Sequence, residues 1–340
     1  MAERFSQLSL PPKWVKEDLD KFAEDYLREK ITDRQNSGAN PIRLSSAGYC
    51  QRKLWYRNFM PETSLGLEAR AMANFELGDT IEQRVRFWLG RIYGEKYRGF
   101  KLVCENCKAD RRVYTPKCPT CGSGDFREYE DIVEFPVPMT DGSTVMVRGH
   151  IDGLLDCPDG MTRIVEIKSA ANFTFFRAKP TLDKLGSLSY DYACQNTAYL
   201  HGMNLTETIF YYVRKETADI GPGLYIKEEG LVAEIQARFR KVLESDSQHP
   251  LPRDYPPVPY KGTHGKPTKA EEGLLVLGYP CSYCEFRQAC YGTLNGRPWF
   301  QREFVSKKDY ASGAIKKEPV MLDRSRRFSD PRTAQEAESE

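Results

Sequence analysis

Four cysteines, separated by about two thirds of the chain, constrain this sequence most strongly. Cys50 stands alone near the start, in the run CQRKLWY, and three more cysteines lie near the end, in the run CSYCEFRQAC. These three are Cys281, Cys284 and Cys290. If all four bind one centre, the two ends of a domain have to meet there. Such a centre closes a loop of more than 200 residues, and its loss would release both ends.

Length and composition allow a packed globular protein. The 340 residues suit one large domain or two modest ones, and a hydrophobic fraction of 40% is enough for a core. The net charge of +2 gives no overall sign of a nucleic-acid binder, although a local groove can still bind one. No apolar stretch approaches the roughly 20 residues of a membrane helix, and the first residues lack the apolar core of a secretory signal. We therefore expect a cytoplasmic protein without a membrane partner, in which ten cysteines favour metal ligation over disulfides.

The order of periodic segments predicts an α/β core. Helical spacing marks residues 13 to 32, 68 to 92, 188 to 203 and 230 to 245. Strand patterns mark residues 129 to 137, 144 to 156, 163 to 168 and 207 to 214. The stretch from 249 to 267 is rich in proline and glycine, which is typical of a long surface connection.

Changes in texture along the chain predict its domain organisation. We expect an N-terminal helical segment at residues 1–40, and a main domain built from residues 41–101 and 131–300. Residues 102–130 hold two C-x2-C pairs and few apolar side chains, so we expect a small insertion there. Residues 310–340 are charged and poor in apolar residues, which is typical of a disordered tail.

Two carboxylates and a lysine gather on a predicted hairpin. Asp152 and Glu166 lie on successive strands around a turn near Asp159, so they come to stand opposite one another. Glu166 and Lys168 are two residues apart and share one face of their strand. Burying these charges without a counter-ion is unfavourable. Mg²⁺ would resolve this and could also ionise a water next to a phosphodiester. The alternative is a surface hairpin with an ordinary Glu–Lys pair.

Asp152 followed by Glu166-x-Lys168 resembles the signature of the PD-(D/E)XK nucleases. The run Gln195-Asn196-Thr197-Ala198-Tyr199 matches the Q-x-x-x-Y motif of the RecB-like branch, and its outer residues share one face of a predicted helix. The resemblance implies a restriction-endonuclease-like core, a mixed sheet flanked by helices. It also implies that Asp152, Glu166, Lys168, Gln195 and Tyr199 form the catalytic site, where the last two contact DNA and support the centre.

A further motif of this branch, G-x-x-x-H, carries a metal-binding histidine on an early helix. This chain has Gly78-Asp79-Thr80-Ile81-Glu82, so a glutamate replaces the histidine. Glutamate is a good ligand for Mg²⁺ or Mn²⁺. The resemblance therefore implies a divalent ion held by Glu82, Asp152, Glu166 and the carbonyl of Ile167. The alternative is that Glu82 is a solvated helical residue.

The separated cysteines resemble those of the iron–sulfur nucleases related to AddB and to the CRISPR-associated RecB-like exonucleases. In that family one cysteine before the nuclease core and three after it hold a 4Fe–4S cluster. The resemblance covers residues 43 to 292 without the insertion, and assigns the cluster to Cys50, Cys281, Cys284 and Cys290. Four thiolates would suit a zinc ion equally well, so zinc stays open as the alternative.

The insertion has the spacing of a zinc ribbon. Its four cysteines, Cys104, Cys107, Cys118 and Cys121, would give zinc a closed tetrahedral site, which is structural and not catalytic. Its basic residues could touch DNA or a protein partner, or simply be solvated: Lys108, Arg111, Arg112 and Lys117. The two remaining cysteines, Cys157 and Cys194, are expected to pack as small hydrophobic residues.

Basic residues interspersed with aromatic ones also flank the expected site. They could line a channel for a DNA strand through phosphate contacts and base stacking, and solvated helix faces explain many of them equally well. These residues are Arg84, Arg86, Arg91, Lys96, Arg98 and Lys101.

Together these patterns predict a Mg²⁺- or Mn²⁺-dependent DNA nuclease that contains an iron–sulfur cluster and a zinc ribbon. By resemblance, we expect an exonuclease acting at DNA ends or on single strands. Enzymes of this kind serve recombination, repair, phage DNA processing or CRISPR adaptation, and their partners are DNA and the proteins of those pathways. The alternative function is a DNA-binding or adaptor subunit that retains the fold without cutting.

Overall fold

The computed structural model describes residues 42–64, 69–99, 101–111, 117–178, 188–255, 257–259, 274–282, 284–291, 295–297 and 302–306, together with Lys21 and Asp25. The chain divides into two compact units. One comprises Met1–Asn40 and Gly66–Asp79, and the other Pro41–Leu65 and Thr80–Glu340. Apart from Lys21 and Asp25, the helix expected at residues 13 to 32 lies outside the described residues, as does the tail expected at 310 to 340. The sheets and the candidate site all belong to the second unit.

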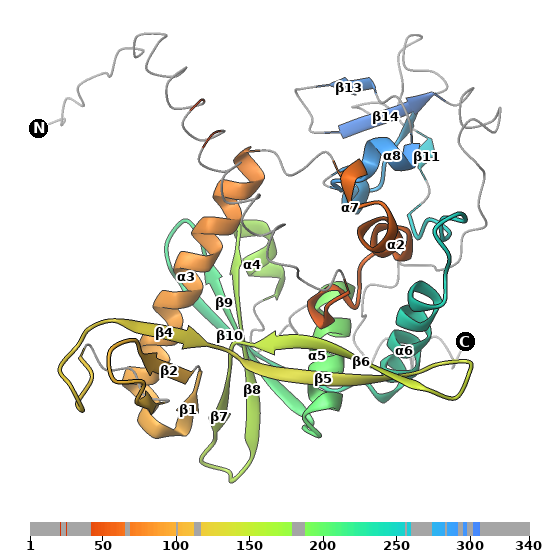
Figure 1. The fold of residues 1–340 in the computed structure, drawn as a ribbon. Coiled ribbons are helices and arrows are strands. Elements are labelled where there is room, and N and C mark those ends of the chain that lie inside the picture. Colours follow the sequence, from red (N-terminus) through yellow and green to blue (C-terminus); the bar gives the residue numbers. More distant parts are fainter. Residues whose placement is uncertain are drawn as a thin grey trace, which may run out of the picture. The chain divides into compact units, whose positions relative to one another are not determined.

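The largest sheet of the second unit has five strands in the order β1-β7-β8-β9-β10 (Figure 1). They are β1 (Tyr97–Arg98), β7 (Gly153–Asp156), β8 (Thr162–Ala170), β9 (Glu207–Arg214) and β10 (Ile220–Ile226). β8 and β9 run parallel, and the other neighbours run antiparallel. β8 is buried at four successive positions, from Ile164 to Ile167, as expected of a strand covered on both faces. This mixed sheet with its helices gives the α/β fold that the sequence predicts.

A strand hairpin and two helices form a second layer, which encloses the main hydrophobic core. β5 (Asp131–Pro138) and β6 (Thr144–Ile151) form a hairpin, and β5 packs against α5 (Tyr190–Gly202) and α6 (Glu229–Leu243). The strands bury alternate residues, and α6 buries residues at helical spacing, so each turns one apolar face inward. The largest of these buried residues include Phe135, Ile151, Leu200, Ile235 and Phe239.

The strand expected at residues 144 to 156 is interrupted at Asp152. Its first part, β6, pairs with β5, whereas its second part, β7, pairs with β8 in the large sheet. Gly153 follows the break with a φ of +157°, and a Cβ there would lie 2.7 Å from the Cα of Gly99. A larger residue would therefore push the two backbones apart. The break leaves Asp152 between the two sheets, beside the central strand.

α3 (Ala69–Tyr93) begins in the first unit and continues into the second from Thr80. Within the second unit, Val85 and Leu89 pack against Val165 and Ile167 of the large sheet. These contacts hold one side of the helix against β8. Glu82 lies one turn before Val85, and Arg86 directly follows it. The same contacts therefore bring both charged residues close to Asp152.

Two segments far apart in the sequence meet at α2 (Gln51–Phe59). The ring of Tyr56 stacks on Phe286 with centroids 5.4 Å apart, and its hydroxyl donates to the carbonyl of Ala289 at 3.0 Å. Figure 1 shows α2 beside α7 (Tyr279–Ser282) and α8 (Arg287–Tyr291). Residues of α2 and of the segment around α8 therefore lie in contact although more than 200 residues separate them in sequence.

The remaining elements complete the described structure. The insertion forms its own sheet, β3-β2-β4, from β2 (Lys101–Cys104), β3 (Asp110–Arg111) and β4 (Phe126–Tyr129). A fourth sheet contains β11 (Val258–Pro259), β12 (Leu274–Val276), β13 (Asn295–Arg297) and β14 (Arg302–Ser306). Short helices are η1 (Leu44–Ser46), η2 (Pro61–Thr63), η3 (Gly94–Lys96) and α4 (Asn172–Ala178). In the described part of the chain, no helix combines the length and apolar character needed to cross a membrane.

Candidate functional site

Asp152 and Glu166 come together where β7 meets β8. The register pairs Gly153 with Val165, so the residues next to this pair, Asp152 and Glu166, are neighbours. Asp152 Oδ2 accepts a hydrogen bond of 2.6 Å from the backbone N–H of Ile167. The bond fixes the carboxylate against the central strand. The expected juxtaposition of the two acids is thus present, and it depends on the strand break after β6.

Glu166 is buried in the central strand, with 1% of its surface exposed. Its Oε1 contacts Lys168 Nζ and accepts a hydrogen bond of 3.0 Å from Gln195 Nε2. Its Oε2 is buried and has no hydrogen-bond partner among the described residues. Burial raises the pKa of Glu166 to about 7, the charge of Lys168 lowers it, and Asp152 adds to the rise. An uncompensated buried oxygen of this kind is suited to a cation.

Lys168 shares the face of Glu166, as two residues apart on one strand require. Its Nζ lies 5.3 Å from the ring centroid of Tyr192 on α5. Burial opposes its charge, but the carboxylates of Glu166 and Asp152 outweigh burial and hold its pKa well above the ordinary range. Lys168 is therefore positively charged in this site.

α5 places Gln195 and Tyr199 against the same acid. The helix begins after Ser189, whose hydroxyl accepts the N–H of Tyr192 and caps the first turn. Gln195 Nε2 also donates to Tyr199 Oη at 3.3 Å, so the two residues form one buried chain that ends on Glu166. Both residues of the Q-x-x-x-Y motif therefore face the site.

Glu82 reaches the site from α3, but its partner is a protein cation. Glu82 Oε1 lies 2.5 Å from Arg86 Nη2, one helical turn along. Burial raises the pKa of Glu82 to about 8, the nearby charge of Asp152 adds to the rise, and Arg86 opposes it. The Glu82 side chain is 29% exposed and engaged in this pair.

Sequence reasoning missed the roles of Arg86 and Glu130. Arg86 was considered for a DNA channel or a solvated helix face, yet its side chain is only 4% exposed and points into the carboxylates. Its Nη2 lies 2.7 Å from Glu130 Oε1 and 3.2 Å from Asp152 Oδ1. The spacing of four between Glu82 and Arg86 could have signalled the first pair. Nothing in the sequence marks Glu130, which lies between β4 and β5.

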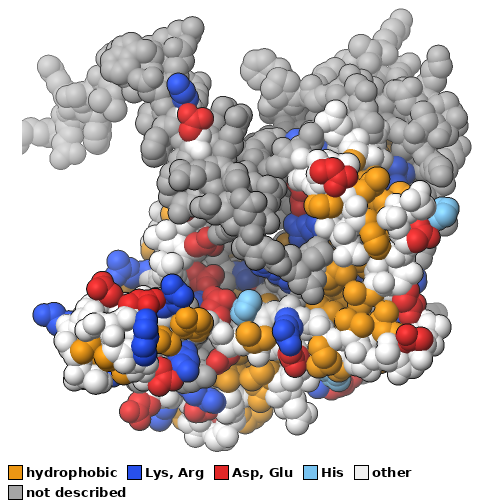
Figure 2. All heavy atoms as spheres, viewed as in Figure 1, with side chains coloured by type: hydrophobic (Ala, Val, Ile, Leu, Met, Phe, Trp, Pro, Cys, Tyr) orange, Lys and Arg blue, Asp and Glu red, His pale blue; other side chains and the backbone are white. Residues whose placement is uncertain are grey.

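The other basic residues expected near the site are partly used within the protein. Arg98 pairs with Asp156 at 2.9 Å, and Lys101 pairs with Asp110 at 2.6 Å. Arg84, Arg91 and Lys96 are exposed. Figure 2 shows acidic side chains gathered between α3 and the β5–β6 hairpin, with blue ones around them. The mouth of the site thus combines an acidic centre with scattered basic residues.

The insertion gathers its four cysteines into a group that could hold a metal. Ligand atoms of Cys104, Cys107, Cys118 and Cys121 all lie within 4.8 Å of one another. The sulfurs of Cys104 and Cys121 are 3.5 Å apart, and those of Cys107 and Cys118 are 3.6 Å apart. A tetrahedral zinc with Zn–S bonds of about 2.3 Å places its sulfurs about 3.8 Å apart. The donor set therefore fits a bound metal such as zinc.

Two matching turns build the insertion, and they explain its C-x2-C pairs. Lys108 N donates to the carbonyl of Cys104 at 2.9 Å, and Gly122 N donates to the carbonyl of Cys118 at 2.6 Å. Both donors have left-handed backbones, with φ of +59° and +76°. Of the basic residues considered for a partner, Lys108 pairs with Glu105 at 3.0 Å, and Arg112 lies outside the described residues.

The second cysteine set also meets in space. Cys50 precedes α2, and Cys281, Cys284 and Cys290 lie on or next to α7 and α8. Burial raises the pKa of the Cys281 thiol, and the charges of Cys50, Cys290 and Cys284 raise it further, because all four are neighbours. Burial also raises the pKa of Cys284 to about 11. Among the described residues, however, no three of these sulfurs all lie within 4.8 Å of one another.

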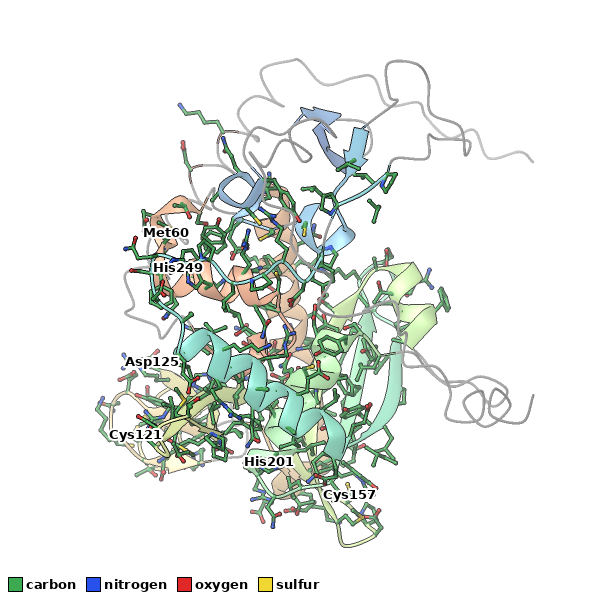
Figure 3. All side chains as sticks on the ribbon, turned by 90° about the vertical axis from the view of Figure 1, so that its right-hand side faces the viewer. Met60, Cys121, Asp125, Cys157, His201 and His249 are labelled. Atoms are coloured by element: carbon green, nitrogen blue, oxygen red, sulfur yellow. The ribbon has the colours of Figure 1, made fainter. Side chains whose placement is uncertain are left out.

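The two remaining cysteines lie away from the metal sets. Cys194 is fully buried in the main core. Cys157 packs at the edge of the smaller core beside Val85, and Figure 3 shows it well apart from Cys121. Both pack with apolar neighbours, as the sequence predicts.

Comparison with known proteins leaves the chain without an assigned family. No protein-family model and no curated protein matches it. Among solved structures, the crystal structure of SSO0001 aligns with 80% of this chain and 98% of its own at 13% identity, with a TM-score of 0.45. LHK-Exo in complex with dAMP aligns with 34% of this chain and 55% of its own at 18% identity, with a TM-score of 0.23. At these scores neither likeness carries an argument. The fold is mixed α/β, and the insertion holds four cysteines placed closely enough to bind a metal.

Proposed function

We propose that this protein is a divalent-metal-dependent DNA nuclease of the PD-(D/E)XK type. The charge imbalance of the site supports this most directly. Its carboxylates are Glu82, Glu130, Asp152 and Glu166, and its cations are Arg86 and Lys168. With all four acids ionised, the site carries an excess of two negative charges; without a metal, the pKa values of about 8 for Glu82 and about 7 for Glu166 mean that protons offset part of that excess. One divalent cation would neutralise that excess, and burying it uncompensated is unfavourable.

Hard oxygen atoms for such an ion are present. Asp152, Glu166 and Glu82, with the carbonyl of Ile167, are the groups that would hold it, and the unpartnered Oε2 of Glu166 is the clearest donor. When bound, Mg²⁺ or Mn²⁺ supplies a water of lowered pKa and a positive charge beside the phosphodiester.

The protein's own residues would then orient the reaction. Lys168, charged and held beside Glu166, would position the attacking water and neutralise charge that builds on the phosphate. Gln195 holds the Glu166 carboxylate through Oε1, which leaves Oε2 available. Tyr199 supports Gln195 from the next turn of α5. The N–H of Ile167 fixes Asp152 in the same way.

The substrate assignment rests on the family resemblance. We propose an exonuclease acting on DNA ends or single strands, in recombination, repair, phage DNA processing or CRISPR adaptation. One observation favours the rival function, a DNA-binding or adaptor subunit that does not cut. Arg86 already pairs with Glu82 and Asp152, so part of the acidic site is balanced without metal.

Digestion of end-labelled DNA separates the two functions. The purified protein is incubated with single and double strands in Mg²⁺, Mn²⁺ or Ca²⁺, beside Asp152→Ala. Asp159→Ala is the matched control, since Asp159 is an exposed acid in the turn of the same hairpin, paired with Arg163 at 2.7 Å. We expect metal-dependent cutting that Asp152→Ala reduces more than about 100-fold, because even groups that only support metal ligands are worth about 10- to 100-fold. No cutting under any condition would leave the adaptor function.

We also propose that Cys50, Cys281, Cys284 and Cys290 hold a 4Fe–4S cluster. Cys50, Cys284 and Cys290 lie near enough to Cys281 for their charges to raise its pKa, which supports one shared centre for the four thiolates. The setting also fits, because Cys284 and Cys290 pack against buried Trp55, Tyr56 and Phe286. Metal analysis of protein prepared without oxygen should find about four irons and about one zinc per chain, given those ligand sets. Two zincs and no iron would contradict the cluster.

A further inference from the structure

Arg86 has an unusual position for a buried ion-pairing residue. One nitrogen, Nη2, contacts three carboxylates, at 2.5 Å from Glu82, 2.7 Å from Glu130 and 3.2 Å from Asp152. An arginine paired for stability usually presents its fork to one carboxylate. Here Nη2 is instead surrounded by oxygens from three separate parts of the chain: α3, the β4–β5 connection and the break between β6 and β7. Arg86 Nε is buried and has no hydrogen-bond partner among the described residues. The guanidinium therefore acts as a point cation at the centre of a carboxylate cluster.

The oxygens that Arg86 contacts overlap with the oxygens a divalent ion would need. Asp152 Oδ2 is taken by the N–H of Ile167, so Oδ1 is its remaining oxygen, and that atom faces Arg86. Glu82 likewise turns Oε1 to Arg86. A divalent cation and the guanidinium cannot both sit close to these two atoms, because like charges at contact distance repel strongly at low dielectric.

Glu130 differs from the other two carboxylates. It lies between β4 and β5, and its side chain is 39% exposed. Of the two partners of Arg86 outside α3, Glu130 accepts the shorter hydrogen bond. It thus offers the guanidinium a partner at the solvent side of the cluster. Arg86 can keep this partner while giving up the two inner carboxylates.

We propose that Arg86 is an internal counter-cation that holds Glu82 and Asp152 while the site is metal-free, and that a divalent ion displaces it onto Glu130. This inference rests on the proposed function, because it requires a metal at Asp152. Arg86 and Glu130 are then positioning residues that set how tightly the site binds metal. Arg86 offsets the repulsion among the carboxylates in the metal-free site and weakens metal binding in return, whereas Glu130 favours metal binding by accepting the displaced guanidinium.

Direct titration with Mn²⁺, followed by the loss of the electron paramagnetic resonance signal of the free ion, tests this in the full-length protein with its cysteine metals loaded. Arg86→Gln should bind Mn²⁺ at least about tenfold more tightly than the wild type, because a competing charge is removed. Glu130→Gln should bind it several-fold more weakly, because Arg86 loses its outer partner. Glu134→Gln controls for loss of one exposed acid on β5, paired with Arg148.

The double variant distinguishes a positioning role from direct ligation. If Glu130 acts through Arg86, adding Glu130→Gln to Arg86→Gln should change the affinity no more than Glu134→Gln does. If Glu130→Gln weakens Mn²⁺ binding equally in the wild type and in Arg86→Gln, Glu130 is a metal ligand and the inference fails. Unchanged or weaker Mn²⁺ binding by Arg86→Gln also overturns it. Should Arg86→Gln not fold, Glu130→Gln decides alone, and binding no weaker than in Glu134→Gln would refute the inference.

The proposed function fails by a different result. If the wild type shows no Mn²⁺ binding that Asp152→Ala removes, the site does not hold a metal, whatever the Arg86 variants do. Binding that depends on Asp152 but is insensitive to Arg86 would leave the nuclease proposal standing and remove only the counter-cation.

Discussion

Replacing Glu82 by glutamine should stabilise the metal-free protein while weakening its metal binding. Glu82 shares one cation with two other carboxylates, and its pKa is raised to about 8 by burial first and by Asp152 second. In the unfolded chain the same group titrates near 4.5. The folded state therefore binds more protons between these values, and its stability falls as the pH rises from about 4.5 to about 8. Glutamine stays neutral and keeps an oxygen that can accept from Arg86.

The size of the effect follows from the two pKa values. At pH 7 the unfolded carboxyl is ionised and the folded one is mostly protonated, so folding has to take up a proton. That uptake costs about 3 kcal/mol, at about 1.4 kcal/mol for each unit between 4.5 and 7. A chain of 340 residues has an unfolding entropy of about 0.7 kcal/mol/K. Glu82→Gln should therefore raise the melting temperature by about 4 °C.

Thermal melts followed by circular dichroism, without Mg²⁺ or Mn²⁺ but with the cysteine metals retained, measure this at pH 5 and pH 7. The variant should gain at pH 7 and differ little at pH 5, where the wild-type group needs less proton uptake. Glu95→Gln, which changes an exposed glutamate just after α3, is the control and should not move the melt. Equal melting temperatures for Glu82→Gln and wild type at pH 7 would refute the raised pKa of Glu82 in the folded protein.

Other predictions follow from the same contacts. Gln195→Ala should lower the cleavage rate about tenfold or more, because Glu166 loses the donor that fixes it. Asn196→Ala on the same helix is the control, and should change the melting temperature without lowering the cleavage rate in this way. Cys281→Ser should remove the iron and lower the melting temperature, whereas Cys104→Ser should remove only the zinc and leave the far-ultraviolet spectrum of the core unchanged; metal analysis beside circular dichroism checks both. Mn²⁺ binding at pH 7 should release a proton, measurable as buffer-dependent heat in calorimetry, since Glu82 has to ionise to bind.

Much of the fold could be predicted because its elements have clean periodicity. The helices α5 and α6 and the strands β5, β8 and β9 lie close to the segments expected from apolar spacing. β10 was missed, because its run IGPGLYI contains glycines and a proline that usually mark a turn. It forms at the sheet edge, where a proline is tolerated.

The charged centre could be predicted only where residues lie near one another in sequence. Glu166 and Lys168 share a strand, and Gln195 and Tyr199 share a helix, so short-range geometry gives both pairs. Both readings considered for Arg86, a DNA channel and a solvated helix face, leave its side chain accessible, and its burial depends on the packing of α3 against β8. The break at Asp152 sends one continuous strand pattern into two sheets. Period-2 alternation alone cannot show such a change of partner.

The most direct test of the proposed function measures Mn²⁺ binding and DNA cleavage together in Lys168→Met. Lys168 is charged, faces Glu166 and is not among the groups that would hold the ion. We therefore predict that the variant still binds about one Mn²⁺ through Asp152 but cuts end-labelled DNA at least about 100-fold more slowly than wild type, as expected for loss of a positioned proton-transfer or charge-neutralising group. Cleavage at the wild-type rate in Lys168→Met, with metal bound, would contradict the assignment of this site.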